Sequence, residues 1–281
     1  MPELPEVEVV RRDLEKEILD RKIRTAEVRS TKNAMRIIRR HRRRKEFEDA
    51  LAGRKIAKID RRGKYLLLYL DNGTILVAHL GMSGQLILSR ATLPMENHTH
   101  VVLDLGAGDQ LRYIDPRSFG EMFVATPSEM GQVTELQKLG LDPLEQPLTW
   151  QYFSETLMLR RTKLKALLMD QRFISGIGNI YSDEILFAAG LRHDRPSETL
   201  GPSEVRRLYR AIQDTLQEAI RHRGTSTEDE QYRDLYGDKG QFQQFLKVYQ
   251  REGQACHRCR TPIERARWSN RSTYYCPQCQ V

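Results

Sequence analysis

The sequence has no apolar run long enough to cross a bilayer, because its most hydrophobic stretches, YLLLYL and ILVAHL, are only as long as single strands. The first ten residues, MPELPEVEVV, carry glutamates where a secretory signal needs basic residues and then an apolar run. We therefore expect a cytoplasmic protein with no membrane segment. Cysteine is scarce, at four residues in 281, and four cysteines in a reducing compartment more often bind a metal than pair as disulfides.

Acidic residues are fewer than basic ones: the chain has 38 Asp and Glu residues and 46 Lys and Arg residues, which gives a formal net charge of +8. An excess of positive charge favours a polyanionic partner, and nucleic acid is the first candidate. The basic residues gather in the run RIIRRHRRRK at 36–45 and again in the last forty residues. Because a basic run is usually a solvated face, this distribution supports nucleic-acid binding without establishing it.

The N-terminal part is predicted to be a helix followed by antiparallel strands. Apolar residues recur at helical spacing from Val7 to Ile18, with charged residues between them. From about residue 54 to 124, short β-like runs take over. KYLLLYL and TILVAHL flank Asp-Asn-Gly at 71–73, and HVVLDL and QLRYID flank a glycine-containing turn at 106–109; both are hairpin signals. We expect an antiparallel sandwich that carries the N-terminal helix.

The C-terminal part is predicted to be mainly helical, which makes the whole chain an α+β protein. Apolar spacing indicates helices at 150–159, at 164–168 and at 205–220, the last closed by a glycine. A glycine-containing turn at 175–179 leads into a further helix that ends near Gly190.

Two cysteine pairs, Cys256-x2-Cys259 and Cys276-x2-Cys279, are separated by sixteen residues, which is typical of two metal-binding knuckles on a hairpin. Four thiolates complete a tetrahedral site and leave no position for a water nucleophile. We therefore expect one structural Zn²⁺. Arginines around the site would turn the metal-braced hairpin into a phosphate-binding surface.

The Met-Pro-Glu start offers a candidate nucleophile. Removal of the initiator methionine would expose Pro2 as a secondary amine. The pKa of an α-amino group is ~7.8 and that of a lysine is ~10.4, and this difference in pKa corresponds to about 3.5 kcal/mol in favour of the unprotonated terminal amine. Such an amine can attack a sugar C1′ and form an iminium ion, with Glu3 and Glu6 close by as acids or bases. The motif alone equally fits a simple helix start.

Six motifs follow one another along the chain: P-E-L-P-E-V, R-G-K-Y, H-L-G-M-S-G, D-P-R-x-F-G, G-I-G-N-I-Y and the two cysteine pairs. This series strongly resembles the formamidopyrimidine-DNA glycosylase family, the bacterial 8-oxoguanine DNA glycosylases, over essentially the whole chain. The resemblance implies a β-sandwich catalytic domain (1–130), a linker (131–149), a helix-two-turn-helix DNA-binding domain (150–224), a mobile loop (225–240) and a zinc finger (241–281).

The resemblance also implies an activity and a setting. A bifunctional, monomeric enzyme would hydrolyse the N-glycosidic bond of 8-oxoguanine and ring-opened purines in double-stranded DNA. It would then cleave the abasic strand by β,δ-elimination. The enzyme would need no diffusible cofactor and would work with the nucleoid DNA of a bacterium.

Catalytic roles carry over from the family residue by residue. Pro2 matches the nucleophile, and Glu3 matches the acid that opens the sugar and protonates the departing base. Glu6 is expected at the lesion pocket. Lys64, in R-G-K-Y, matches the lysine that assists β-elimination, and Arg271 matches the zinc-finger arginine that grips phosphate and helps δ-elimination.

A second group of residues matches the family's DNA contacts. A damaged base must be flipped out of the duplex and the vacated stack filled, for which Met and Phe are suitable wedges while Arg can hydrogen-bond the orphaned base. Taken alone, the apolar wedges would more often be strand core. The candidates are Met82, Arg117 and Phe119 as the wedge trio, and His98, Arg160 and Asn179 at the DNA backbone.

The sequence departs from the family pattern at four places: Arg260 and Gln250 replace usual glycines, Ser118 replaces a common basic residue, and the stretch 225–241 lacks a Tyr-Val-Asn-like segment. Because the family closes this last loop over the flipped base, lesion preference is the property most affected. Two rivals remain: an endonuclease VIII-type enzyme for oxidised pyrimidines, and a catalytically silent DNA-binding protein. Leu4 argues against the first, and intact Pro2, Glu3 and Lys64 argue against the second.

Overall fold

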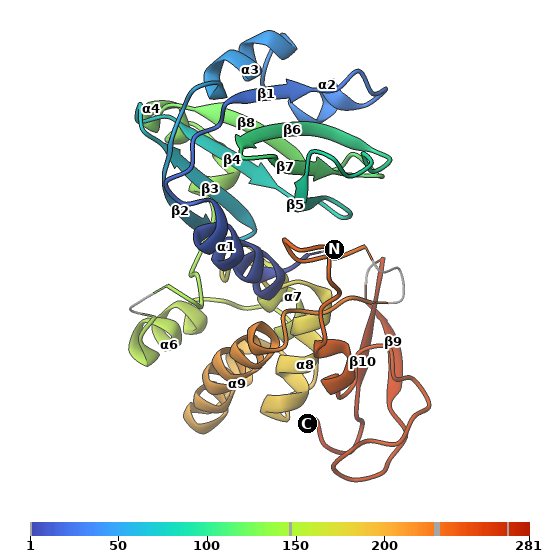
Figure 1. The fold of residues 1–281 in the computed structure, drawn as a ribbon. Helices are drawn as coiled ribbons and strands as arrows, with labels where there is room; N and C mark the ends of the chain where they lie inside the picture. The colour runs from blue at the N-terminus through green and yellow to red at the C-terminus, as the bar shows by residue number, and fades with distance from the viewer. Residues whose placement is uncertain (1, 146–147, 228–230, 269) are drawn as a thin grey trace. The chain divides into compact units, whose positions relative to one another are not determined.

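The computed structural model describes residues 2–145, 148–227, 231–268 and 270–281 (Figure 1). The chain forms two compact units, the first made of residues up to Gln137 together with His222–Gln243, and the second of Lys138–Arg221 together with Gln244–Val281. The domain boundaries predicted from the sequence are contiguous, so they do not assign His222–Gln243 to the first unit. No helix among the described residues is long and apolar enough to cross a membrane.

The first unit contains two four-stranded antiparallel sheets, so the predicted α+β fold with an antiparallel sandwich is confirmed (Figure 1). One sheet has the strand order β1-β6-β7-β5 and the other β2-β3-β4-β8. Both predicted hairpins are present, as the pairs β3–β4 and β6–β7. The strands are β1 (Thr25–Val28), β2 (Ile56–Arg62), β3 (Tyr65–Leu70), β4 (Ile75–His79), β5 (Gln85–Arg90), β6 (Thr99–Gly106), β7 (Asp109–Ile114) and β8 (Glu121–Ala125).

The N-terminal helix α1 (Leu4–Ile18) packs on β2 and β3. Val7, Val10, Leu14 and Ile18, which carry the predicted helical spacing, are all fully buried in the core of this unit. The apolar stripe therefore holds the helix, and with it the chain's first residues, against the sandwich. The described residues of this unit also form four shorter α-helices: α2 (Ala34–Ile37), α3 (Arg44–Leu51), α4 (Pro127–Met130) and α5 (Thr134–Gln137).

The segment 231–240 packs against β5 of the first unit. Tyr232 is 4% exposed and Leu235 is fully buried, and both belong to the hydrophobic core. The N–H of Leu88 donates to the carbonyl of Leu235 (2.9 Å). The polar composition of 225–240 predicts a mobile loop; its residues 228–230 lie outside the described residues, whereas two apolar side chains attach the later part to the sandwich.

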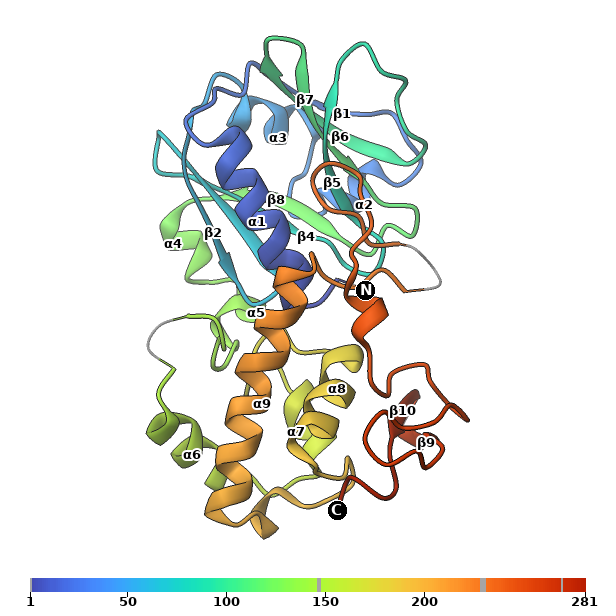
Figure 2. The ribbon, with the colours of Figure 1, turned by 60° about the horizontal axis from the view of Figure 1, so that its bottom comes forward.

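The helices of the second unit follow the predicted order. α8 (Asn179–Ala189) is followed directly by Gly190, whose φ of +67° lies in the left-handed region that favours glycine after a helix. α9 (Pro202–Arg221) packs along α8 (Figure 2). The elements are α6 (Trp150–Met158), α7 (Leu164–Met169), α8 (Asn179–Ala189), the 3-10 helix Ser197–Thr199 and α9 (Pro202–Arg221), and a further 3-10 helix spans Phe242–Phe245.

The C-terminal hairpin consists of β9 (Glu264–Trp268) and β10 (Arg271–Tyr275), paired antiparallel. A small cluster of buried residues supports it, formed by Phe187 of α8 with Val248, Cys256, Ile263 and Cys276. Two of these five side chains are thiols, so little apolar surface stabilises the hairpin without a metal.

Candidate functional site

One end of the sandwich gathers several predicted site residues. In the sheet register, Tyr65 of β3 lies opposite His79 of β4, and His79 lies opposite Glu121 of β8. The β2–β3 turn, the β4–β5 loop and the β7–β8 loop therefore leave their strands at the same end. These three connections carry Lys64, Met82, and Arg117 with Phe119.

An ion pair ties α1 to this end of the sandwich. The guanidinium of Arg61, on β2, donates to the carboxylate of Glu8 (3.0 Å) and to the carbonyl of Gly63 (3.0 Å), and both charged side chains are nearly buried. Because Gly63 directly precedes Lys64, this pair connects the first turns of α1 with the lysine-bearing turn. Pro2, just before the helix, is buried.

Glu6 fixes the start of α1. Its carboxylate accepts from the N–H of Glu3 (2.8 Å) and from the N–H of Thr225 (2.8 Å), and Glu3 and Glu6 are 2% and 1% exposed. Gly224, at φ +79°, approaches this carboxylate so closely that a Cβ would lie 2.8 Å from Glu6 Oε1. Glu6 therefore connects Glu3, the predicted acid, to Thr225, where the 225–240 segment begins.

His79 stays neutral beside the lysine-bearing turn. Burial, together with the positive charge of Lys64, lowers the pKa of His79 to about 4, although Glu121 opposes this effect. The imidazole lies 4.5 Å from the ring centre of Tyr65, and burial raises the pKa of that phenol to about 12. The charge of Lys64 therefore acts on a pair of rings that are both neutral near pH 7.

The predicted wedge trio is exposed. Met82 is 37% and Phe119 44% exposed, and Arg117 is exposed too. The guanidinium carbon of Arg117 lies 5.2 Å from the ring centre of Phe119. The two apolar side chains are therefore not strand core, which was the alternative interpretation of their sequence pattern.

Asp115 holds the two wedge-bearing loops together. Its carboxylate accepts from Ser83 Oγ (2.5 Å) and from the N–H of Gly120 (2.8 Å), while Ser83 Oγ accepts from the N–H of Arg117 (3.1 Å). A Cβ at Gly81 would lie 2.5 Å from the nitrogen of Gly120, so the two backbones touch. Glycine is needed at 81 for this approach and for its φ of +60°.

Two histidines form hydrogen bonds with the backbone of Asp115, at the start of the loop that carries Arg117 and Phe119. His98, a predicted DNA contact, is exposed at φ +62°, and its carbonyl accepts from the N–H of Asp115 (3.1 Å). His100, which the sequence did not single out, is buried and bonds the Asp115 carbonyl (3.0 Å) and Thr31 Oγ1 (2.6 Å) through its two ring nitrogens.

The second unit holds Arg160 and Asn179. Asn179 is the first residue of α8, and a helix N-terminus is a natural phosphate site. Gln171 braces the preceding turn by accepting from the N–H of Gly176 and donating to the carbonyl of Ile177, both at 2.8 Å. Among the described residues, the buried Oδ1 of Asn179 and Nε of Arg160 have no hydrogen-bond partner.

A fully buried carboxylate joins α8 to the hairpin. Asp183 accepts from Lys165 Nζ (2.5 Å), from Thr273 Oγ1 (2.6 Å) and from the N–H of Tyr274 (3.0 Å). Burial raises the pKa of Asp183 while the charge of Lys165 opposes the rise. These contacts fix β10 two residues after Arg271.

The next residue, Glu184, anchors a different segment to the same helix. Its carboxylate accepts three consecutive backbone N–H groups, from Lys247 (2.9 Å), Val248 (3.0 Å) and Tyr249 (2.8 Å). Burial raises the pKa of Glu184 although these three bonds oppose it. Neither carboxylate was singled out from the sequence, where Asp-Glu is typical of an ordinary helical pair.

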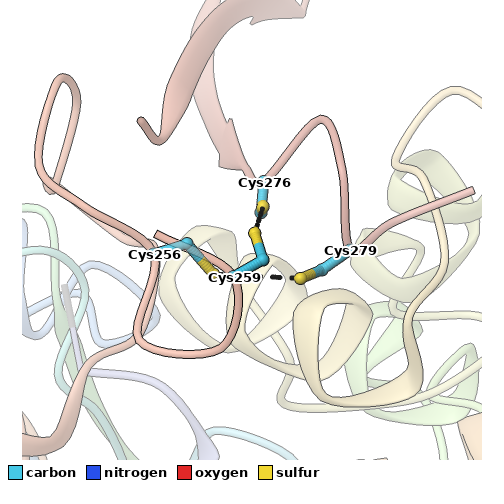
Figure 3. Close-up of side chains that lie close together, drawn as sticks. All are labelled: Cys256, Cys259, Cys276 and Cys279. Atoms are coloured by element: carbon cyan, nitrogen blue, oxygen red, sulfur yellow. Dashed lines mark hydrogen bonds between the residues drawn. The ribbon is translucent and has the colours of Figure 1, made fainter. Parts of the chain in front are cut away.

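The four cysteine side chains converge (Figure 3), with their sulfurs all within 4.8 Å of one another. The Sγ atoms of Cys256 and Cys279 are 3.9 Å apart, and those of Cys259 and Cys276 are 3.4 Å apart. Sulfurs placed about 2.3 Å from a tetrahedral Zn²⁺ would be about 3.8 Å apart. The donor set and its spacing therefore fit a zinc ion.

Arg271 begins β10 and is exposed. Its guanidinium approaches Met169 Sδ at 3.9 Å. A hollow of about 420 Å³ opens over the hairpin. It is lined by Arg265, Ala266, Arg267, Asn270, Arg271 and Ser272.

Three family models match consecutive parts of the chain. They are the formamidopyrimidine-DNA glycosylase N-terminal domain over residues 1–122, the formamidopyrimidine-DNA glycosylase H2TH domain over residues 139–231, and the zinc finger found in FPG and IleRS over residues 253–281. These matches follow the sandwich, the helical module and the cysteine cluster in order.

Full-length relatives agree. The formamidopyrimidine-DNA glycosylase of Pelotomaculum thermopropionicum is 42% identical over 280 residues, covering 100% of this chain and 99% of that protein. The crystal structure of MutM (Fpg) from Thermus thermophilus is 40% identical with a TM-score of 0.86, covering 99% and 98% of the two chains. Lactococcus lactis Fpg, solved with abasic-site DNA and, as a mutant, with Fapy-dG DNA, is 33% identical with a TM-score of 0.88, covering 99% of both chains.

Fold and site together define an enzyme of the DNA glycosylase and AP lyase class. More specifically, the chain belongs to the formamidopyrimidine-DNA glycosylase family. The family predicted from the six motifs is confirmed.

Proposed function

We propose that this enzyme excises 8-oxoguanine and formamidopyrimidines from duplex DNA through a Schiff base on Pro2, and then nicks the abasic strand by β,δ-elimination. The observation that carries the proposal is the tie between the start of α1 and the Lys64 turn through Glu8 and Arg61. The relatives solved with abasic-site and Fapy-dG DNA support the substrate class.

The chemistry follows from the amine at the start of a helix. Once the initiator methionine is removed, the positive end of the α1 dipole disfavours a protonated amine at Pro2. The nitrogen lone pair of Pro2 attacks C1′ as the glycosidic bond breaks, and the electron pair of that bond leaves with the base, which takes a proton from Glu3. Glu3 regains the proton that the Pro2 nitrogen loses and passes it to O4′ as the C1′–O4′ bond breaks, which leaves the C1′=N⁺ iminium ion. Lys64 then assists β-elimination from the iminium sugar, and Arg271 steadies the phosphate that leaves by δ-elimination.

The remaining residues bind DNA in this proposal. Met82, Arg117 and Phe119 fill the space of the flipped base, which their exposure permits. His98, Arg160 and Asn179 contact backbone phosphates. One Zn²⁺ on the four cysteines is structural, because four thiolates leave it no open position.

Borohydride trapping tests the proposal. Wild-type protein incubated with an 8-oxoguanine duplex should give a covalent adduct that maps to Pro2, because borohydride reduces the iminium ion. Pro2→Gly keeps a terminal amine and should trap more slowly, whereas a retained N-terminal residue should abolish trapping and strand cleavage.

Pro5→Ala is the matched control, since it changes a proline at the start of the same helix without touching the terminal amine. It should trap at close to the wild-type rate. A protein with a retained N-terminal extension that cleaves lesion DNA normally would refute Pro2 as the nucleophile. Faster trapping on oxidised-pyrimidine duplexes than on 8-oxoguanine duplexes would contradict the proposed substrate class.

A further inference from the structure

Part of the basic run at 36–45 covers the edge of a sheet. Arg39 and Arg40 pair with the buried carboxylate of Glu121 (2.9 and 3.2 Å), and Nε2 of His41 accepts a hydrogen bond from the N–H of Val124 (3.0 Å). β8 is the outer strand of its sheet, so these side chains cover an edge that would otherwise be open to pairing. Edge protection accounts for this part of the run.

Edge protection does not account for Arg36 or for the nearby Lys32. Both side chains are exposed. Over the described part of the chain, no carboxylate forms an ion pair with either one. The guanidinium of Arg36 lies 5.3 Å from the ring centre of Phe119, which the guanidinium of Arg117 approaches at 5.2 Å. An uncompensated positive charge therefore lies directly beside the wedge loop.

The segment that carries Lys32 is anchored to the same loop. Thr31 Oγ1 bonds Nδ1 of His100 (2.6 Å), whose Nε2 bonds the carbonyl of Asp115 (3.0 Å). His100 is 2% exposed, so this bridge is sheltered from water. A cation on a segment fixed in this way loses less freedom on binding an anion than one on a free loop.

We propose that Lys32 and Arg36 form a second phosphate-binding element, which contacts the DNA backbone next to the place where Arg117 and Phe119 enter the duplex. The proposal rests on the function proposed above. Its ligand is the phosphodiester backbone, because two exposed cations without acidic partners carry charge and no base-reading geometry. The element adds affinity that is independent of base sequence and sensitive to salt.

The salt dependence of binding tests this proposal on undamaged duplex DNA, without any catalytic step. Each phosphate neutralised adds about 0.9 to the magnitude of the slope of log K against log salt. The double variant Lys32→Gln/Arg36→Gln should therefore lower that magnitude by about 1.8. Between about 50 and 200 mM salt, wild-type affinity should fall about twelvefold more than that of the variant.

The matched control is Lys58→Gln/Arg90→Gln, which removes the same formal charge from the same unit. Lys58 pairs with Asp60 (2.9 Å) and Arg90 pairs with Asp109 (2.8 Å). Arg90 ends β5 and Asp109 begins β7, at the end of that sheet opposite to the wedge loops. The control should keep the wild-type slope.

Two further variants complete the test. Lys32→Gln alone leaves the Arg36–Phe119 contact intact and should lower the slope by about 0.9, and Lys32→Arg/Arg36→Lys should keep the wild-type slope because it keeps both charges. A double glutamine variant with the slope of the control pair would overturn the proposal. That result would leave borohydride trapping by the wild type unaffected. If instead the proposed function were wrong, trapping would be absent whatever the slope of log K against log salt.

Discussion

At the scale of single residues, Gln250 and Arg260 carry a conformational cost. Their φ angles of +56° and +68° lie in the left-handed region, where a residue with a Cβ is destabilised by about 1–2 kcal/mol. The family resemblance places glycine at both positions. The zinc-finger region of this chain therefore holds backbone strain that a glycine at either position would release.

Gln250→Gly and Arg260→Gly should each stabilise this region. The relief of strain, less the entropic cost of glycine, leaves roughly 0.5–1 kcal/mol in the free energy of unfolding. Ala255→Gly is the control, since Ala255 is not among the positive-φ residues, and it should destabilise by roughly 0.5–1 kcal/mol. Denaturant titration of the zinc-loaded protein, followed by metal release, measures all three. Destabilisation by both glycine variants would show that their side chains stabilise the finger by more than the strain costs.

Arg117 and Phe119 should affect substrate choice in different ways. A guanidinium can hydrogen-bond the acceptor edge of an orphaned cytosine and matches adenine poorly, so its loss should cost about 1–3 kcal/mol of discrimination. Stacking by Phe119 depends little on base identity. Arg117→Ala should therefore flatten the preference for lesion:cytosine over lesion:adenine, whereas Phe119→Ala should slow all pairs alike.

Single-turnover excision on duplexes that differ only in the opposing base makes this comparison. The Asp115 network holds the backbone of the loop that carries both Arg117 and Phe119, so truncating one of these side chains should not displace the other. An unchanged cytosine-to-adenine ratio in Arg117→Ala would assign Arg117 to the backbone alone.

At the scale of elements, the sheet β2-β3-β4-β8 should be acid-sensitive through His79. The folded pKa of about 4 lies below the ordinary value of 6.5, so the unfolded chain binds this proton more tightly. Stability is therefore full above pH 6.5 and is lost as pH falls towards 4, by about 3 kcal/mol for the whole shift. Burial is the largest cause of this low pKa, the charges of Lys64 and Arg39 add to it and that of Glu121 opposes it, while the ring of Tyr65 packs against the imidazole.

His79→Phe keeps an aromatic ring against Tyr65 and removes the titration. Urea unfolding at about pH 7 and about pH 4 should show a loss of stability smaller by about 3 kcal/mol in the variant than in the wild type. Comparable losses in both proteins would mean that carboxylates, and not His79, control the acid response.

Elements with a strong local pattern could be predicted from the sequence. The spacing of Val7, Val10, Leu14 and Ile18 predicted α1, and the Asp-Asn-Gly turn predicted the β3–β4 hairpin, because each pattern depends on neighbours a few residues away. The attachment of 231–240 could not be predicted in this way. It depends on Tyr232 and Leu235, two apolar residues in a polar stretch that reach a core made by residues far earlier in the chain.

The same distinction applies to the candidate site. Ordered motifs identified Pro2, Glu3 and Lys64 as candidates, and the cysteine spacing predicted a cluster that the structure brings together. The supporting groups were missed because their partners are remote in sequence: His100 bonds Thr31 across 69 residues, and Asp183 bonds Thr273 across 90. A short polar side chain gives no sequence signal of such a partner.

At the scale of the whole molecule, stability is divided between two units of different construction. The first has an extensive apolar core drawn from both sheets and α1. The hairpin of the second has a small cluster with two thiols in it, and it is fixed to α8 by the carboxylate of Asp183. The next carboxylate, Glu184, fixes the segment 247–249 to the same helix. Loss of the metal should therefore be a local event.

Zinc removal tests this division. Chelation, or Cys256→Ser, should release one zinc per chain and unfold the hairpin, because a metal-braced element this small depends on its ion. Most secondary structure should survive in far-ultraviolet circular dichroism, since the sheets and α9 lie outside the finger. Affinity for a lesion duplex should fall steeply, because the exposed arginines of the hairpin lose their arrangement.

Readdition of zinc to the chelated wild type should restore binding. Metal analysis that finds no zinc in fully active protein, or chelation that unfolds both units together, would show that the finger is not the separate, metal-dependent element that its small core indicates.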